Sequence, residues 1–161
     1  MEKLHLETIG YWNDKRFDPQ SDIFINPQAL VLHDSWTQEE KAKIVSYLKG
    51  GYEYVYYLGF SYDRFDSNTP DEDMGSSELT DGAFSWPFGL AHYVEKYNIE
   101  LPEEFLEVIR FNNYKVVMYE ELENYFENDG YEHVEESTVY WRQWCLIKKE
   151  NYGKGLIISD S

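Results

Sequence analysis

Hydrophobic residues recur at helical spacing just after a recognisable helix start. Thr37 precedes Glu40 by three residues, which is a capping box in which each side chain bonds the backbone amide of the other residue. The apolar positions that follow at helical spacing are Ile44, Val45 and Leu48. Gly50 and Gly51 then break the pattern. We therefore expect a helix that begins after Thr37 and ends before Gly50.

The next stretch, YEYVYYLGFSY from Tyr52 to Tyr62, changes from helical spacing to alternation. Its even positions are Tyr52, Tyr54, Tyr56, Leu58, Phe60 and Tyr62. Because successive side chains of a strand point to opposite faces, this pattern predicts a strand with one aromatic face. Six large side chains exceed what one sheet face commonly buries. The face is therefore either core or, in part, an exposed tyrosine patch.

Two further helices are predicted in TDGAFSWPFGLAHYVEKYNIELPEEF, from Thr80 to Phe105. Asp81-Gly82 is a turn pair, and Trp86-Pro87 forces an extended residue before the proline. The apolar stripe of the first helix is Leu90, Tyr93, Val94 and Tyr97. Pro102 suits the first position of the second helix, where a missing amide hydrogen is tolerated. The apolar stripe of the second helix is Phe105, Leu106, Val108 and Ile109.

The remaining segments give weaker patterns. Asp63 to Asp81 is rich in turn-forming and acidic residues and predicts a surface loop. Short strands are predicted at Ile23–Ile25, Ala29–His33, Tyr114–Tyr119 and Gly155–Ser159, and a helix at Glu121–Asn128. Ser137 to Glu150 fits a helix or a strand. Together these elements predict one α+β domain over residues 1–161, a small antiparallel or mixed sheet packed with several short helices.

Charge narrows the classes of partner. Thirty-one acidic residues against fourteen basic ones give a formal net charge of -17. Such a chain repels phosphate backbones and anionic lipid headgroups, so we expect it to bind neither nucleic acid nor a membrane. The same field would speed encounter with a basic protein partner. Simple solubility is the alternative explanation of the charge.

Cysteine content and missing motifs narrow the chemistry. Cys145 is the single cysteine, so neither an intrachain disulfide nor a CxxC metal site can form. The sequence has no phosphate-binding loop of the GxxxxGK[ST] or GxGxxG kind and no HExxH, so we expect neither cofactor nor metal. The first twelve residues lack the pattern of a secretory signal, and no apolar run approaches the ~18 residues of a membrane span. A cytoplasmic location is therefore expected.

One catalytic hypothesis involves His92. It lies near Asp81 in sequence, at the start of a short helix, where it could serve as a general base in a pocket framed by Trp86. Leu90 and Val94 stand two residues on either side, which turns the imidazole away from the apolar stripe and predicts an exposed or rim position. For each histidine in this chain, a structural or surface role is the simpler interpretation.

The stretch from Thr80 to Phe105 also resembles a signature of small acidic bacterial proteins of mostly unassigned function. The shared pattern is TDG, then Trp-Pro, then GLAHYV, then Leu-Pro and Phe, and it covers about a sixth of the chain. The resemblance implies a connection to toxin-immunity loci. It carries no catalytic residue with it.

Two classes of function follow as hypotheses. The first is a binding protein, an immunity or antitoxin-type inhibitor that covers a basic toxin, such as a nuclease, with acidic and tyrosine-rich surface. Its expected contact residues are Glu120, Glu121, Glu123, Glu127, Asp129, Glu132, Glu135, Glu136, Tyr54, Tyr56 and Tyr57. The second is a small enzyme that uses Asp81 and His92. A regulatory or scaffold domain without catalysis is a third possibility, and the sequence leaves the oligomeric state open.

Overall fold

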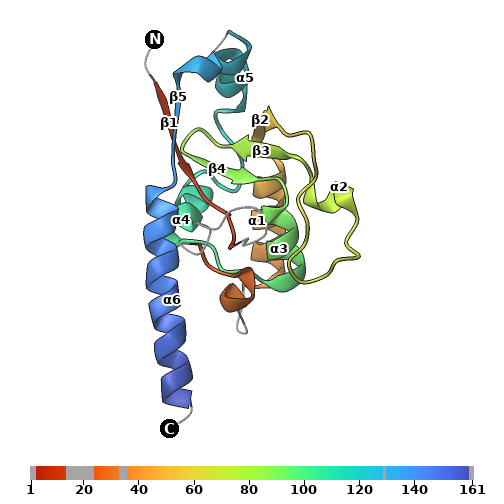
Figure 1. Cartoon of the computed structure of the whole chain (residues 1–161). Helices are drawn as coiled ribbons and strands as arrows, with labels where there is room; N and C mark the ends of the chain where they lie inside the picture. Colours follow the sequence, from red (N-terminus) through yellow and green to blue (C-terminus); the bar gives the residue numbers. More distant parts are fainter. Residues whose placement is uncertain (1–2, 14–23, 33–35, 129, 160–161) are drawn as a thin grey trace.

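Alternating side chains build a mixed five-stranded sheet within residues 3–13, 24–32, 36–128 and 130–159, which the computed structural model describes (Figure 1). The strands are β1 (Leu4–Thr8), β2 (Tyr52–Tyr56), β3 (Ser77–Thr80), β4 (Phe84–Pro87) and β5 (Val134–Ser137). Their order is β2-β3-β4-β1-β5. The first three of these are antiparallel neighbours, whereas β1 runs parallel to both β4 and β5. The predicted α+β class is confirmed.

Helices cover both faces of this sheet. The helices are α1 (Gln38–Lys49), α2 (Asp71–Met74), α3 (Leu90–Tyr97), α4 (Glu103–Phe111), α5 (Tyr119–Glu127) and α6 (Val139–Ser159). Short 3-10 helices lie at Pro27–Leu30 and Gly130–His133. The longest helix, α6, runs alongside the domain and extends beyond it to the C-terminus (Figure 1).

The hydrophobic core lies on the sheet face that carries Leu79 and Trp86, which are paired across β3 and β4. Trp86 is fully buried, and its indole N–H donates to the carbonyl oxygen of Leu48 at 3.0 Å. Tyr47 of α1 stacks on the Trp86 ring, and Phe105 of α4 packs against it with ring centroids 5.2 Å apart. A large aromatic side chain with its N–H satisfied thus joins two helices to the sheet.

The opposite face is partly polar and is covered by α5. Because side chains alternate along a strand, Glu78 and Thr80 point away from the Leu79 core. Phe126 of α5 stacks on Tyr52 at 5.4 Å and packs against Tyr54 at 5.2 Å. The second face therefore combines tyrosine rings with buried polar groups.

The predicted start of α1 is half confirmed. The Thr37 hydroxyl accepts a hydrogen bond from the Glu40 amide at 3.1 Å, as a helix cap should. Glu40 does not reach back to Thr37, because its carboxylate bonds Arg110 at 2.9 Å and Tyr114 at 3.3 Å. A charged donor on α4 thus replaces the second half of the capping box.

The expected strand from Tyr52 to Tyr62 is too long. A register shift between Glu53 and Val55 marks a bulge, and β2 ends at Tyr56. Tyr54 is buried, while the side chains from Tyr56 to Phe60 are exposed. The aromatic alternation therefore belongs partly to the core and partly to the surface, so both interpretations hold for different residues.

The other weak segments differ more from expectation. Asp63 to Asp81 is not only a surface loop, since it contains α2 and the wholly buried β3. Tyr114–Tyr119 is not a strand, because Asn113 and Tyr114 adopt left-handed backbone angles that reverse the chain after α4. Ser137–Glu150 is mainly helical, and Gly155–Ser159 continues the same helix instead of forming a strand.

The strands expected near the N-terminus are also wrong where the structure describes them. Residues 24–26 are not in a strand, and Pro27–Leu30 forms a 3-10 helix capped by the Asn26 side chain. Val31 makes one antiparallel bridge with Ile99. Ile23 and His33 lie outside the described residues. Asn26-Pro27 favours a local turn, which explains why no extended strand forms here.

A substitution at Gly51 tests how tightly the core is packed around this residue. A β-carbon at Gly51 would lie 2.8 Å from Cζ2 of Trp86 and 2.9 Å from Cβ of Leu79. Gly51→Ala should therefore lower the free energy of unfolding by about 1–3 kcal/mol, measured by urea denaturation. Gly59→Ala is the matched control, because a β-carbon there has no neighbour within 4 Å. Equal stability of the two variants would contradict this account of the core.

Candidate functional site

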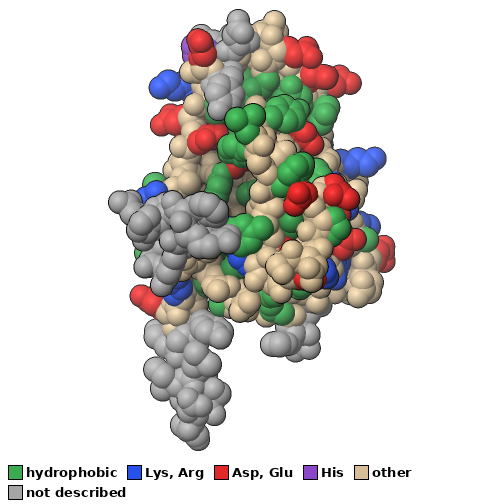
Figure 2. Space-filling view, turned by 45° about the vertical axis from the view of Figure 1, so that its right-hand side comes forward, with side chains coloured by type: hydrophobic (Ala, Val, Ile, Leu, Met, Phe, Trp, Pro, Cys, Tyr) green, Lys and Arg blue, Asp and Glu red, His purple; other side chains and the backbone are tan. Residues whose placement is uncertain are grey.

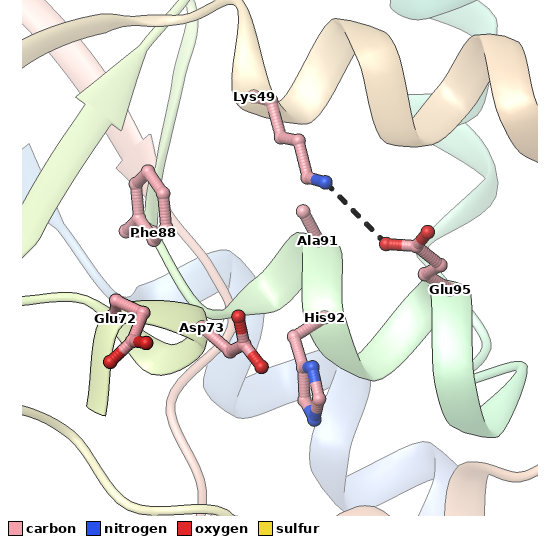
Figure 3. A pocket seen from close by; sticks show the side chains of 7 residues that line it. All are labelled: Lys49, Glu72, Asp73, Phe88, Ala91, His92 and Glu95. Carbon is pink, nitrogen blue, oxygen red and sulfur yellow. Dashed lines mark hydrogen bonds and ion pairs between the residues drawn. The ribbon is translucent and has the colours of Figure 1, made fainter. Parts of the chain in front are cut away.

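A hollow of about 280 Å³ opens beside His92, between α1, α2 and α3 (Figure 3). Its lining residues are Lys49, Glu72, Asp73, Phe88, Ala91, His92 and Glu95. The His92 side chain is 13% exposed, so it lies at the rim as expected. Lys49 Nζ lies 3.5 Å from the Glu95 carboxylate. With three acids against one paired lysine, this His92 hollow suits a cation better than an anion.

The partner of His92 is Asp63, whose carboxylate is fully buried. His92 Nε2 lies 2.9 Å from Asp63 Oδ2. The other donors to this carboxylate are the Tyr97 hydroxyl at 2.7 Å, the Thr69 hydroxyl at 2.8 Å and the Phe65 amide at 2.8 Å. Burial opposes ionisation, but these hydrogen bonds outweigh it and lower the pKa of Asp63 to about 2.

This arrangement determines which nitrogen of the imidazole faces Asp63 with a hydrogen. An ionised carboxylate only accepts hydrogen bonds, so His92 Nε2 carries the proton that faces Asp63. Neutral His92 then has Nδ1 as its only basic nitrogen. Tyr93 and Tyr97 of the same helix also hold the Tyr62–Asp66 segment. The Tyr93 hydroxyl accepts a hydrogen bond from the Arg64 amide and donates one to the Tyr62 carbonyl oxygen. The Tyr97 ring stacks on Phe65. The His92–Asp63 pair therefore anchors a chain segment to α3.

The expected site of Asp81, His92 and Trp86 does not form. Asp81 is buried and accepts the Tyr47 hydroxyl at 2.6 Å, and its other oxygen accepts the amides of Ala83 and Phe84. Burial raises the pKa of Asp81, although these hydrogen bonds oppose the rise. Trp86 is fully buried and does not line the His92 hollow. Asp81 stabilises the turn in which it lies. The position beside His92 that was predicted for Asp81 is occupied by Asp63.

A second carboxylate cluster lies under α5, and sequence reasoning missed it. The Tyr54 hydroxyl lies 2.5 Å from Glu136 Oε1 and 3.3 Å from Glu78 Oε2. Burial and the nearby Glu136 raise the pKa of Glu78 to about 7. One hydroxyl proton cannot serve two carboxylates at once, so a protonated Glu78 completes the cluster. The acid-rich sequence around Glu78 gave no sign of this burial.

Exposed apolar side chains begin at Tyr56, the last residue of β2, and continue into the segment that follows it. We call Tyr56, Tyr57, Leu58 and Phe60 the tyrosine ridge; Tyr56 is 71% exposed and Leu58 is fully exposed. Figure 2 shows hydrophobic side chains gathered in the upper half of one face, with acidic side chains at their border. On one side the ridge borders a hollow lined by Tyr57, Phe60 and Met74. Contiguous exposed apolar surface of this kind is typical of interaction sites.

On its other side the ridge borders α5. Here a hollow of about 410 Å³, the Tyr119 hollow, is lined by Lys49, Gly50, Gly51, Tyr52, Glu53, Tyr56, Tyr119 and Glu123. The tyrosine ridge and the acidic helix therefore adjoin each other.

The acidic residues expected to meet a partner are mostly on the surface. Glu120, Glu121, Glu123 and Glu127 are exposed on α5, and Glu132 and Glu135 are exposed further along. Glu136 is exposed but also accepts the Tyr54 hydroxyl. Tyr54 is buried, so it cannot anchor a partner directly, whereas Tyr56 and Tyr57 can. Asp129 lies outside the described residues.

Other kinds of site find little support among the described residues. They contain no group of three or more His, Cys, Asp or Glu side chains that could hold a metal ion. Burial raises the pKa of the Cys145 thiol to about 11, which makes it a poor nucleophile. In the same part of the chain, no helix is long and apolar enough to cross a membrane.

Comparison of this chain with family models, with curated proteins and with solved structures found no match.

The buried charge of Asp63 makes stability depend on pH at the acid end. Because the pKa of Asp63 is lowered from 3.8 to about 2, its ionised form stabilises the fold above pH 4, and this stabilisation is lost as the pH falls toward 2. Asp63→Asn should lower the free energy of unfolding by about 2 kcal/mol at pH 7 and by less at pH 2–3. Denaturant titrations across this range measure it, with the exposed Asp73→Asn as control. A loss that stays constant with pH would contradict the assignment.

Glu78 makes the stability of the fold depend on pH in the opposite direction. Its pKa is raised from 4.5 to about 7, so the folded state holds a proton that the unfolded state releases, and stability falls as the pH rises through this window. We expect a loss of about 3 kcal/mol between pH 4.5 and pH 8 that Glu78→Gln abolishes. Thermal unfolding against pH measures this, with the exposed Glu127→Gln as control. Parallel curves for Glu78→Gln and the unmodified chain would show that Glu78 does not titrate here.

Proposed function

We propose that this chain is an inhibitory binding protein of the immunity or antitoxin type, acting in the cytoplasm on a basic protein partner. The observation that carries the proposal is the tyrosine ridge, which lies beside the acidic helix α5. Exposed aromatic side chains supply the central contacts that dominate binding energy at interfaces. Surrounding carboxylates supply long-range attraction and orientation. The resemblance of Thr80–Phe105 to small acidic bacterial proteins of toxin-immunity loci agrees with this proposal.

The charge of the surface defines the partner's chemistry. The four exposed glutamates of α5 lie within one helix that contains neither Lys nor Arg. A basic domain that grips a phosphate backbone, such as a nuclease toxin, presents the complementary field. Binding there would place carboxylates where the toxin's own substrate carries phosphates. Inhibition would then follow from occupation of that surface.

A catalytic alternative rests on His92 at the rim of its hollow, bonded to the buried Asp63. That pair resembles an oriented general base. However, the same contacts anchor residues 62–66 to α3, a role that requires no substrate. The binding proposal accounts for surface features that folding alone leaves unexplained, and we therefore prefer it.

The test is affinity capture from the native host lysate at low salt with stepwise salt elution. We expect one basic protein to elute at moderate salt, and its isolated activity to fall when the purified chain is added. A variant with Glu120, Glu121, Glu123 and Glu127 changed to Gln should lose the capture. Since the interaction is electrostatic, its affinity should fall steeply with ionic strength.

The matched control carries the same number of neutralised acids on other surfaces. It changes the exposed Glu39, Glu72, Glu104 and Glu107 to Gln, so both variants have a net charge of -17 + 4 = -13. The control should retain capture and inhibition. Equal loss in both variants would indicate a general effect of charge and would count against α5 as the binding surface.

A further inference from the structure

The Tyr119 hollow has the composition of a receptor for a cationic side chain. Tyr119 and Tyr52 meet nearly edge to face, with ring centroids 5.5 Å apart and an interplanar angle of 71°. Tyr56 lines the same hollow and is 71% exposed. Tyrosine rings set at steep angles to one another form the walls of an aromatic box, and ring faces attract cations.

Carboxylates complete the electrostatics of the hollow. Glu53 and Glu123 line it, and burial, followed by the nearby carboxylate of Glu53, raises the pKa of Tyr56. Burial first, and then the charges of Glu127 and Glu123, raise the pKa of Tyr52. Tyr52 and Tyr56 therefore stay neutral while the surrounding field is negative. Lys49 is the cation among the lining residues, and its ammonium is paired with Glu95 of α3.

We propose that this hollow binds an arginine side chain of the partner, with the guanidinium against Tyr56 and Tyr119 and bonded to Glu53 or Glu123. Arginine fits better than lysine because its planar group stacks on rings and presents a fork of donors to carboxylates. The inference rests on the proposed function only for the identity of the occupant. The hollow itself can be tested on the isolated chain.

The probe is Nα-acetyl-L-arginine amide, titrated into the chain while the tyrosine ring resonances are followed by NMR. We expect saturable shifts of the Tyr56 and Tyr119 signals. The neutral isostere Nα-acetyl-L-citrulline amide should cause none, because it lacks the charge. Tyr56→Ala should weaken binding by about two- to fivefold, as expected for one exposed cation–π contact.

Four variants separate the contributions of ring, charge and position. Tyr119→Phe keeps the aromatic ring and should retain binding of the arginine probe. Tyr119→Ala removes the ring and should lose that binding. Glu123→Gln, a change of an exposed side chain, should weaken binding without affecting the fold. Tyr57→Ala is the positional control, because Tyr57 is equally a ridge tyrosine but lines the neighbouring hollow.

Each outcome supports or overturns the proposal. If the citrulline probe binds with the same affinity as the arginine probe, the proposed site is wrong. It is also wrong if Tyr56→Ala and Glu123→Gln both bind the arginine probe as tightly as the unmodified chain. Equal affinity for a lysine probe, Nα-acetyl-L-lysine amide, would overturn the assignment to arginine. If the probe binds as expected but the lysate yields no basic partner, the proposed function fails and the cation site stands. If a partner is captured but the probe does not bind, the site alone fails.

Discussion

The Tyr54 hydroxyl joins the two edge strands of the sheet. Tyr54 belongs to β2 at one edge and Glu136 to β5 at the other, yet their oxygens are 2.5 Å apart. In a flat sheet, four strand spacings would separate these edges by about 19 Å. The sheet must therefore curl until the edges approach across the face that α5 covers. Other features of this face, including the burial of Glu78, follow from this curvature.

Curvature determines which aromatic residues are available to a partner. The bulge in β2 directs Tyr54 into the concave face, where it bonds Glu136. Tyr52 stays half-buried against Phe126, whereas β2 ends at Tyr56 and the chain leaves the sheet. The tyrosine ridge is thus the continuation of a strand whose first residues are core. Its first member, Tyr56, is paired with Ser77 of β3.

The sequence predicts those parts of the fold that depend on contacts between residues close together in the chain. Thr37 and Gly50 mark the ends of α1, and the apolar stripe of α3 is continuous, so short-range patterns sufficed for both helices. The partner of His92 lies 29 residues away, and the partner of Tyr54 lies 82 residues away. The alternating pattern put Tyr54 and Tyr56 on the same face of a strand, although Tyr54 is buried and Tyr56 is exposed. Such distinctions depend on sheet curvature, which the sequence pattern does not encode.

Solubility alone does not explain the combination of acidity with an exposed apolar ridge. Scattered carboxylates would keep a chain in solution, but a contiguous run that includes Tyr56 and the fully exposed Leu58 works against solubility. Single exposed apolar residues are ordinary, whereas a run of them beside an acidic helix is not. Concentrated like charges also oppose compact folding by self-repulsion. Both features cost the isolated protein stability or solubility, and a basic partner that covers the ridge and neutralises α5 would remove both costs at once.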